Sequence, residues 1–325
     1  MPAAVLPPWL ARLPSEDGLV FISDARRYSH DEAAYDTQYP IDAGNLKVGQ
    51  GLIKWLRTIA ADFSAPALEL GCGTGLLSLG LIADSPYPLA IISDPSPEFL
   101  RITRAKAVAA TLDQTRTCFA VLKGEELDRL PAGTLSLIVL RATLHHVLDV
   151  EAFLRSASRV LLPGGILAFQ EPCMEGCILM GAMIQFLPAL AAGAGEPLSP
   201  EQKKKVDDFA NAMAFYARRD VDKSQAEDKH LFRVDEVMVT ARRHGLDVTF
   251  DGNVSFDYPV LEPTPAPRAF SKSFRSYARY CMSWDESMMA LFDRHIAPMT
   301  RLIDTASGGG PGPYLDGVFM CRKVR

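Results

Sequence analysis

The spacing of apolar positions changes several times along the chain, and these changes predict alternating helices and strands. Between residues 49 and 63 apolar side chains recur every three or four residues, which predicts an amphipathic helix. Short apolar stretches follow; the near-continuous run at 135–140 is typical of a parallel strand buried on both faces, whereas 246–250 alternates apolar and polar residues. The predicted strands cover residues 65–70, 89–93, 118–122, 135–140, 166–170, 246–250 and 317–322.

The segments between these strands have helical spacing. Helices are expected over residues 76–83, 97–108, 150–161 and 234–244. Strands and helices that alternate in this way indicate an α/β fold. We expect a Rossmann-like, doubly wound, mostly parallel seven-stranded sheet with an antiparallel last strand.

Two long stretches interrupt the alternation, and we interpret them as largely helical cap insertions. The first contains a nearly uncharged run followed by a helix, and the second begins with prolines and continues with aromatic and methionine residues. The expected organisation is an N-terminal arm and lid at 1–48, an α/β core at 49–175, a helical cap insertion at 176–233, a core continuation at 234–256, a second cap insertion at 257–313 and a last core strand at 314–325.

The uncharged run at 177–195 is nearly long enough to cross a bilayer. Gln185 and Pro188 within it, and the acids Glu175 and Glu196 beside it, argue against a stable membrane span. A methionine-rich cap helix over a pocket is the favoured reading, because methionine adapts to varied apolar partners. A protein held at a membrane surface is the rival.

Charge and cysteine content narrow the function classes further. The 325-residue chain has a net charge of −5, so we expect no nucleic acid partner. Six cysteines are too few for a disulfide scaffold in a chain of this length, and the N-terminus lacks the pattern of a signal peptide. We therefore expect a cytoplasmic protein with free thiols and no metal site.

A glycine-rich turn, Gly71-Cys-Gly-Thr-Gly75, joins the first predicted strand to the next helix. Such a turn lets backbone N–H groups approach a ligand at a helix N-terminus. The third glycine of the dinucleotide fingerprint would fall at Leu76, so the spacing disfavours an NAD-dependent oxidoreductase. Glu69 suits a ligand with an ammonium group and no pyrophosphate, and S-adenosylmethionine (SAM) fits.

Three further motifs follow the glycine turn in order: Asp94-Pro-Ser-Pro-Glu-Phe-Leu100, Leu144-His-His-Val147 and Leu161-Leu-Pro-Gly-Gly165. Together the four motifs resemble those of class I SAM-dependent methyltransferases with a methyltransferase type 11/12-like domain. The resemblance extends over residues 49–172 and hardly touches the two insertions. It implies that SAM is the cofactor and that residues 49–175 bind it.

The resemblance assigns the cofactor site to the ends of the predicted strands. Asp94, at the end of the second strand, would accept hydrogen bonds from the ribose hydroxyls. Glu69 and the glycine turn would hold the methionine moiety, although Glu69 as a structural brace of the turn is the alternative. The acid that commonly holds the adenine is displaced here, so Glu125 or backbone groups would replace it. The expected cofactor-binding residues are Glu69, Gly71, Cys72, Gly73, Gly75, Asp94, Pro95, Gly124, Glu125 and Arg141.

His145 and His146 follow the fourth predicted strand, where open α/β sheets place ligands. Methyl transfer from SAM needs alignment and, for a hydroxyl acceptor, a base, and histidine suits that base. Neighbouring histidines point to different sides, so at most one should face the acceptor; the alternative is that they are wall residues of the SAM pocket. Arg141 would bind an anionic acceptor or pair with an acid. The expected catalytic residues are His145, His146 and Arg141, and the expected substrate-binding residues are Tyr28, His30, Tyr39 and Glu171.

The sequence thus predicts a SAM-dependent methyltransferase that acts on a small-molecule or glycan acceptor. Transfer to a hydroxyl of a metabolite, natural product or glycan precursor is the main hypothesis. N- or C-methylation of such an acceptor, or an inactive SAM-binding partner subunit, are the alternatives. The sequence does not identify the acceptor, and it is compatible with a homodimer.

Overall fold

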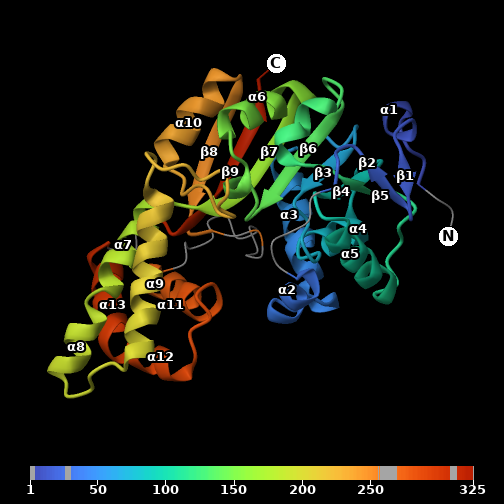
Figure 1. Cartoon of the computed structure of the whole chain (residues 1–325). Coiled ribbons are helices and arrows are strands. Elements are labelled where there is room, and N and C mark those ends of the chain that lie inside the picture. The colour runs from blue at the N-terminus through green and yellow to red at the C-terminus, as the bar shows by residue number, and fades with distance from the viewer. Residues whose placement is uncertain (1–3, 26–30, 255, 257–268, 308–312, 325) are drawn as a thin grey trace.

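The computed structural model describes residues 4–25, 31–254, 256, 269–307 and 313–324. Within these residues nine strands form one sheet in the order β1-β2-β5-β4-β3-β6-β7-β9-β8 (Figure 1). The strands β2 to β7 pair in parallel, and β9 runs antiparallel to both β7 and β8. The antiparallel last strand is confirmed. The strands are β1 (Ser15–Glu16), β2 (Leu19–Phe21), β3 (Ala67–Leu70), β4 (Ala90–Asp94), β5 (Thr117–Val121), β6 (Leu135–Arg141), β7 (Leu161–Pro172), β8 (Leu246–Gly252) and β9 (Asp316–Lys323).

The sheet has two more strands than the seven expected, and both come from the N-terminal arm. β1 and β2 form a tight hairpin, and β2 pairs in parallel with β5. Asp17 and Gly18 connect the two strands with φ values of 51° and 76°. An Asp-Gly pair with positive φ favours a two-residue hairpin turn, and the prolines around it obscured this signal. The buried Leu19 and Val20 hold the hairpin on the sheet.

Helices cover both faces of the sheet, as the apolar runs of the strands require. Ile91 and Ile92 are neighbours in β4 but belong to different hydrophobic clusters, because side chains alternate across a strand. One face is covered by α1 (Pro8–Ala11), the 3-10 helix η2 (Gly124–Arg129), α6 (Val150–Val160) and α10 (Val234–Arg243), and the other by α3 (Leu46–Thr58), α4 (Ser78–Asp84) and α5 (Pro97–Ala109).

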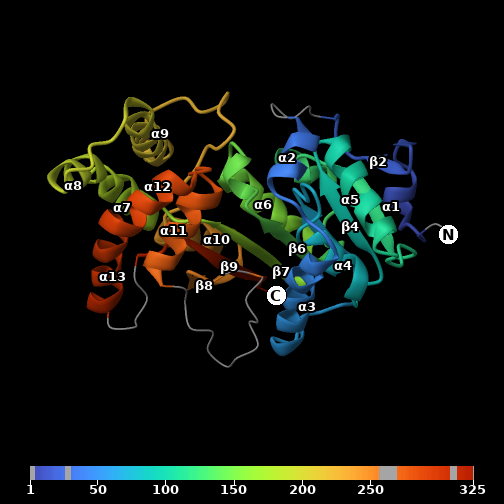
Figure 2. The same cartoon turned by 90° about the horizontal axis from the view of Figure 1, so that it is seen from below.

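The described helices of the two insertions fold together into a helical cap with a hydrophobic core of its own (Figures 1 and 2), and residues 257–268 and 308–312 of the second insertion lie outside the described residues. Trp284, Phe209 and Phe274 lie at its centre and are buried. Its elements are α7 (Met174–Ile184), α8 (Leu187–Gly193), α9 (Pro200–Ala217), α11 (Phe270–Tyr280), α12 (Glu286–Leu291), the π-helix η4 (Phe292–Ile296) and α13 (Ala297–Ala306). In Figure 2 the cap lies to one side of the sheet, so a site at the strand ends on that side faces the cap.

Met174–Gly193, which spans α7 and α8, is one segment among the described residues with the length and composition of a membrane span. Its mean hydropathy is 1.7, and 44% of the apolar window is buried inside the protein. A core helix of a soluble protein passes the same test. The absence of a stable membrane span therefore stays a prediction.

Candidate active site

The glycine turn follows β3 and adopts a backbone conformation that suits glycine. Gly71, Gly73 and Gly75 have φ values of 70°, 50° and 103°. A Cβ on Gly71 would lie 2.9 Å from Thr143 Cβ and closer still to other Thr143 atoms. A Cβ on Gly73 would meet nothing within 4 Å. Gly71 is therefore held against the turn after β6, whereas Gly73 faces open space.

Asp94 ends β4 beside this turn and is buried, with 4% of its surface exposed. Its carboxylate accepts hydrogen bonds from the backbone N–H of Gly73 at 3.0 Å and of Ser96 at 2.8 Å. Burial raises the pKa of Asp94 to about 7, although the two N–H donors favour its ionised form. The carboxyl thus titrates close to neutral pH at the point where a ligand would approach Gly73.

Glu69 lies within β3 and is also buried. It accepts a hydrogen bond from Ser78 Oγ at 2.7 Å, at the start of α4. Burial raises the pKa of Glu69 to about 8, against the effect of the Ser78 hydroxyl. Glu69 therefore braces β3 against α4, which agrees with the alternative that it has a structural role. It also lines the cavity described next.

A cavity of about 520 Å³ opens at the carboxyl ends of β3, β4 and β6. Of the ten residues expected to bind the cofactor, Gly75 is the one that does not line it; a Cβ on Gly75 would meet Thr103 and Leu79 instead. Other residues that were not among the expected site residues also line the cavity. These include Tyr35, Phe99, Leu122, Thr143, Val147 and Cys281.

The helix α2 (Glu32–Gln38) forms part of the cavity wall and bridges to the cap. Tyr35 and Tyr39 line the cavity with their ring centroids 4.8 Å apart. Glu32 accepts a hydrogen bond from Ser96 Oγ at 2.8 Å, and Gln38 donates one to Ser283 Oγ of the cap at 3.2 Å. Tyr39 thus lies where a substrate-binding residue was expected. Tyr28 and His30 lie outside the described residues.

Arg141, the last residue of β6, brings a positive charge to the same cavity. Its Nε is buried and has no hydrogen-bond partner among the described residues. Buried donors in native proteins usually have a partner, so this N–H is available to an acidic or carbonyl group of a ligand.

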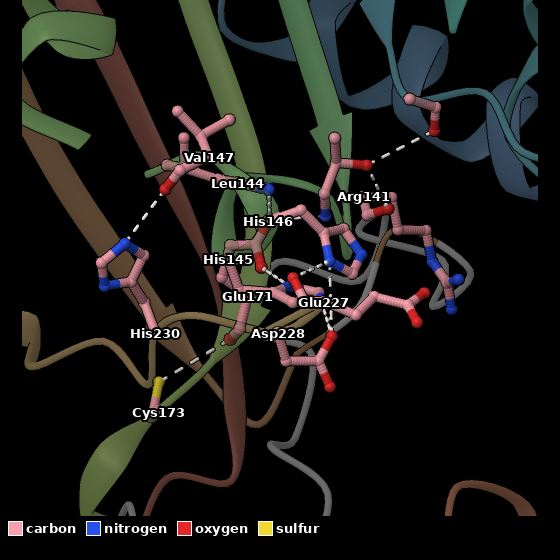
Figure 3. Close-up of polar contacts among 12 residues, drawn as sticks. Arg141, Leu144, His145, His146, Val147, Glu171, Cys173, Glu227, Asp228 and His230 are labelled. Carbon is pink, nitrogen blue, oxygen red and sulfur yellow. Dashed lines mark hydrogen bonds and ion pairs between the residues drawn. The ribbon is translucent and has the colours of Figure 1, made fainter. Parts of the chain in front are cut away.

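The turn η3 (Leu144–His146) carries the two histidines, and Glu171 of β7 holds it in place (Figure 3). Glu171 Oε1 accepts from the backbone N–H of Thr143 at 2.8 Å and of Leu144 at 2.5 Å. Its Oε2 lies 2.6 Å from His145 Nδ1. Glu171 was expected to contact substrate, but it does not line the cavity and its side chain is fully buried. Its contacts are those of a positioning residue, because the strand alternation turns it beneath η3.

His145 lies between two carboxylates. On one side is Glu171, and on the other Nε2 lies 3.4 Å from Asp228 Oδ1. Burial alone would lower the pKa of His145, but the charges and hydrogen bonds of Glu171 and Asp228 outweigh it and raise this pKa to about 10. His145 is therefore an imidazolium at neutral pH, and it does not line the cavity.

His146 has the opposite character and does line the cavity. Its Nδ1 lies 3.0 Å from the carbonyl oxygen of Glu227 and 3.3 Å from Asp228 Oδ1. Burial, and then the charge on His145, lower the pKa of His146. An imidazole that donates Nδ1–H to Glu227 leaves Nε2 with a lone pair. This Nε2 has no hydrogen-bond partner in the part of the chain that the structure describes.

Glu227 and Asp228 come from the first cap insertion, and the sequence offered no signal for them. They lie more than 80 residues beyond the histidines, in a stretch without motif or periodicity. The ligand atoms of His145, His146 and Asp228 lie within 4.8 Å of one another, which is close enough to hold a metal ion. The hydrogen bonds already described account for this proximity, and the expectation of no metal site stays a prediction.

Comparison with known proteins identifies the segment that carries this site. A family model described as a methyltransferase domain matches residues 68–169. The chain is 31% identical over 150 residues to the reducing polyketide synthase Preu2 of Preussia isomera, 34% over 109 residues to the thiol S-methyltransferase TMT1B of Homo sapiens, and 32% over 102 residues to a ubiquinone biosynthesis O-methyltransferase of Methylocella silvestris. These matches cover 45%, 33% and 31% of this chain but only 6%, 43% and 37% of the relatives.

The fold is similar to that of solved structures over a larger part of the chain. A crystal structure of a candidate sarcosine dimethylglycine methyltransferase from Galdieria sulphuraria aligns with a TM-score of 0.51. It covers 90% of this chain and 98% of its own, at 13% sequence identity. At that identity the likeness establishes the fold alone, and the expected Rossmann-like α/β class is confirmed.

Proposed function

We propose, on the premise that residues 68–169 match a methyltransferase domain, that the protein transfers the methyl group of SAM to a hydroxyl of a small-molecule or glycan acceptor. The observation that carries the proposal is the cavity at the strand ends, where nine of the expected cofactor residues meet His146. The S- and O-methyltransferases among the relatives support methyl transfer but do not settle the acceptor.

SAM would occupy the cavity, and each part of the molecule would face a different set of residues. Asp94 would accept from the ribose hydroxyls, and Gly124 and Glu125 would face the adenine. The carboxylate of the methionine moiety suits Arg141, whose Nε has no partner among the described residues. The glycine turn supplies backbone N–H groups and close approach at Gly73.

His146 is the proposed general base. Its lowered pKa keeps the imidazole neutral, and the Glu227 carbonyl at Nδ1 leaves the Nε2 lone pair to take the acceptor proton. As the proton moves to Nε2, His146 becomes an imidazolium, and the Asp228 carboxylate, 3.3 Å from His146 Nδ1, would stabilise that charge. The oxygen then displaces S-adenosylhomocysteine from the methyl carbon in line.

C-methylation is the second candidate, and one observation favours it. The longest of the three sequence matches above is to a polyketide synthase, over 150 residues. Chains with alternating carbonyls contain acidic C–H groups, and a positioned imidazole can remove such a proton as it would remove one from a hydroxyl.

The test uses SAM with a trideuterated methyl group and a panel of hydroxyl, thiol, amine and 1,3-dicarbonyl compounds, with products identified by mass. A labelled hydroxyl product is expected. His146→Gln should reduce turnover about 10²- to 10⁴-fold, the usual contribution of a general base, without loss of SAM affinity. His295→Gln, in the cap, is the matched control. Tight SAM binding with no labelled product from any class would point instead to an inactive partner subunit.

We also propose that the protein works in a reducing compartment such as the cytoplasm. All six cysteines are free, and five of them are buried. Disulfides are rare in the cytoplasm, so unpaired cysteines support this location.

A further inference from the structure

A second cavity lies apart from the candidate active site, between α6, α10 and residues 216–232. Its volume is about 450 Å³, and it shares no lining residue with the cavity at the glycine turn. The inner wall is apolar, with Leu154, Leu231, Phe232 and Val237 buried. Such a wall fits an apolar group of a ligand.

The outer wall of this cavity is basic, in a chain whose net charge is negative. Five lysine and arginine side chains line it against three carboxylates. The basic residues are Arg218, Arg219, Lys223, Lys229 and Arg233, and the acids are Glu151, Asp222 and Glu236. The positive charge that matters for a ligand is that of the basic residues without a carboxylate partner.

The three arginines already have carboxylate partners. Arg218 pairs with Asp220 at 2.6 Å, and Arg233 with Asp235 at 2.9 Å. Arg219 pairs with Glu236, which is one of the three acids of the cavity. The remaining acids are also engaged: Glu151 lies 3.2 Å from His244 Nε2, and Asp222 accepts from the backbone N–H of Ser224.

Lys223 differs from these arginines. Only 8% of its surface is exposed, and it forms no ion pair with any described residue. Its ammonium donates to the carbonyl oxygen of Tyr216 at 2.7 Å and lies 5.6 Å from the centre of the Phe215 ring. A buried ammonium costs free energy unless it meets a negative charge, and burial lowers the pKa of Lys223 accordingly. A ligand anion in the cavity would supply that charge.

Lys229 adds a second buried ammonium to the same wall, with 3% of its surface exposed. It donates to the carbonyl oxygens of Ala226 at 2.8 Å and Glu227 at 3.2 Å. The helix α10 also begins at this wall, and its N-cap residue Arg233 makes no side-chain capping bond. The first turn of this helix already carries Asp235 and Glu236, so it is the two buried lysines that favour a carboxylate or a phosphate.

We propose that this cavity binds an organic anion, a carboxylate or phosphate monoester joined to an apolar chain. The apolar wall would hold the chain, and Lys223 with Lys229 would hold the anionic group. The wall is tied to the histidine turn: the backbone N–H of Lys229 donates to the carbonyl of His145 at 2.8 Å, and His230 Nε2 lies 3.0 Å from the carbonyl of Val147 (Figure 3). A ligand in the cavity would therefore contact the same segment, residues 228–230, that places Asp228 beside His145.

Calorimetric titration of the whole chain, saturated with SAM, tests the proposal. Octanoate and octyl phosphate are the probes, and octanol is the uncharged control. Both anions should bind one saturable site, and Lys223→Met should weaken them at least about tenfold, as expected for the loss of one charge-assisted contact. Lys204→Met, an exposed lysine of α9 paired with Asp208, should leave their affinity unchanged. The difference between the two probes shows which anionic group is preferred.

Two more measurements keep the proposal falsifiable if Lys223→Met does not fold. Thr240→Trp, on the α10 wall, should fill the cavity and abolish binding of the anions. In histidine-labelled protein, octanoate should shift the imidazole resonances of His230 and leave those of His295, in the cap, in place. Absence of saturable anion binding, equal affinity in Thr240→Trp, or shifts confined to His295 would overturn the proposal.

Discussion

His145 Nδ1 lies 2.6 Å from Glu171 Oε2, and this contact joins the turn after β6 to the carboxyl end of β7. The same carboxylate accepts the backbone N–H groups of Thr143 and Leu144. A single buried side chain therefore sets both the path of the turn and the charge of its first histidine. It also leaves His146, the next residue, on the cavity wall.

This pairing predicts a stability that depends on pH. The pKa of His145 rises from its ordinary 6.5 to about 10, so the folded protein holds this proton more tightly than the unfolded chain. The contribution is complete below pH 6.5 and is lost as the pH rises through 10. Glu171→Gln should cost about 3 kcal/mol at pH 6, the usual cost of breaking a buried pair, and less at pH 10.5. Denaturant unfolding at both pH values measures it. Glu98→Gln, at an exposed pair with Arg101, is the control, and a cost that does not change with pH would contradict the assignment.

SAM affinity should rise between pH 6 and pH 8. The ribose contact needs an ionised Asp94, whose pKa is about 7, so the fraction in the correct form increases about tenfold over that interval. Affinity should increase by about the same factor in calorimetric titrations. Asp94→Asn should bind SAM weakly and lose this part of the pH dependence, which separates it from the titration of SAM itself. Equal pH profiles for the two proteins would rule out a role for the Asp94 charge.

Two glycines of the same turn should respond differently to alanine. A Cβ at Gly71 collides with Thr143 and also requires φ of 70°, so Gly71→Ala should destabilise the protein by about 2–4 kcal/mol. A Cβ at Gly73 meets no neighbour, so Gly73→Ala carries only the backbone strain of φ 50°, about 1 kcal/mol, but this Cβ would project into the space proposed for SAM. Unfolding and SAM titrations on both variants distinguish the effects. The prediction fails if Gly73→Ala binds SAM as tightly as the wild type does.

Removal of metal ions should leave the protein unchanged. The Nδ1 atoms of His145 and His146 already have hydrogen-bond partners, the Glu171 carboxylate and the Glu227 carbonyl oxygen. Elemental analysis of the purified protein should find no stoichiometric zinc, and dialysis against a chelator should not alter its thermal unfolding. One bound zinc per chain that disappears in His145→Ala would instead assign His145, His146 and Asp228 as ligands.

Local patterns were sufficient for the core of the protein. The apolar runs that became β3 to β7 reflect burial between two helical layers, β8 shows an alternating pattern, and Asp94 and the glycine turn carry their own signals at the strand ends. The expected cofactor residues could therefore be placed together before any fold was known. The hairpin at Asp17-Gly18 was missed because the four prolines that precede it indicate an irregular segment, and a turn of two residues is too short a signal to outweigh them.

The sequence by itself determined the α/β class, the order of the core elements and most of the predicted residues that line the cavity at the strand ends, because short-range periodicity and spacing encode them. Only the tertiary structure decided which histidine faces the cavity. That choice depends on Glu171, on the next strand, and on Glu227 and Asp228, delivered by an insertion without periodicity. A charge acts through space at distances of a few ångströms, and separation along the chain does not reveal it.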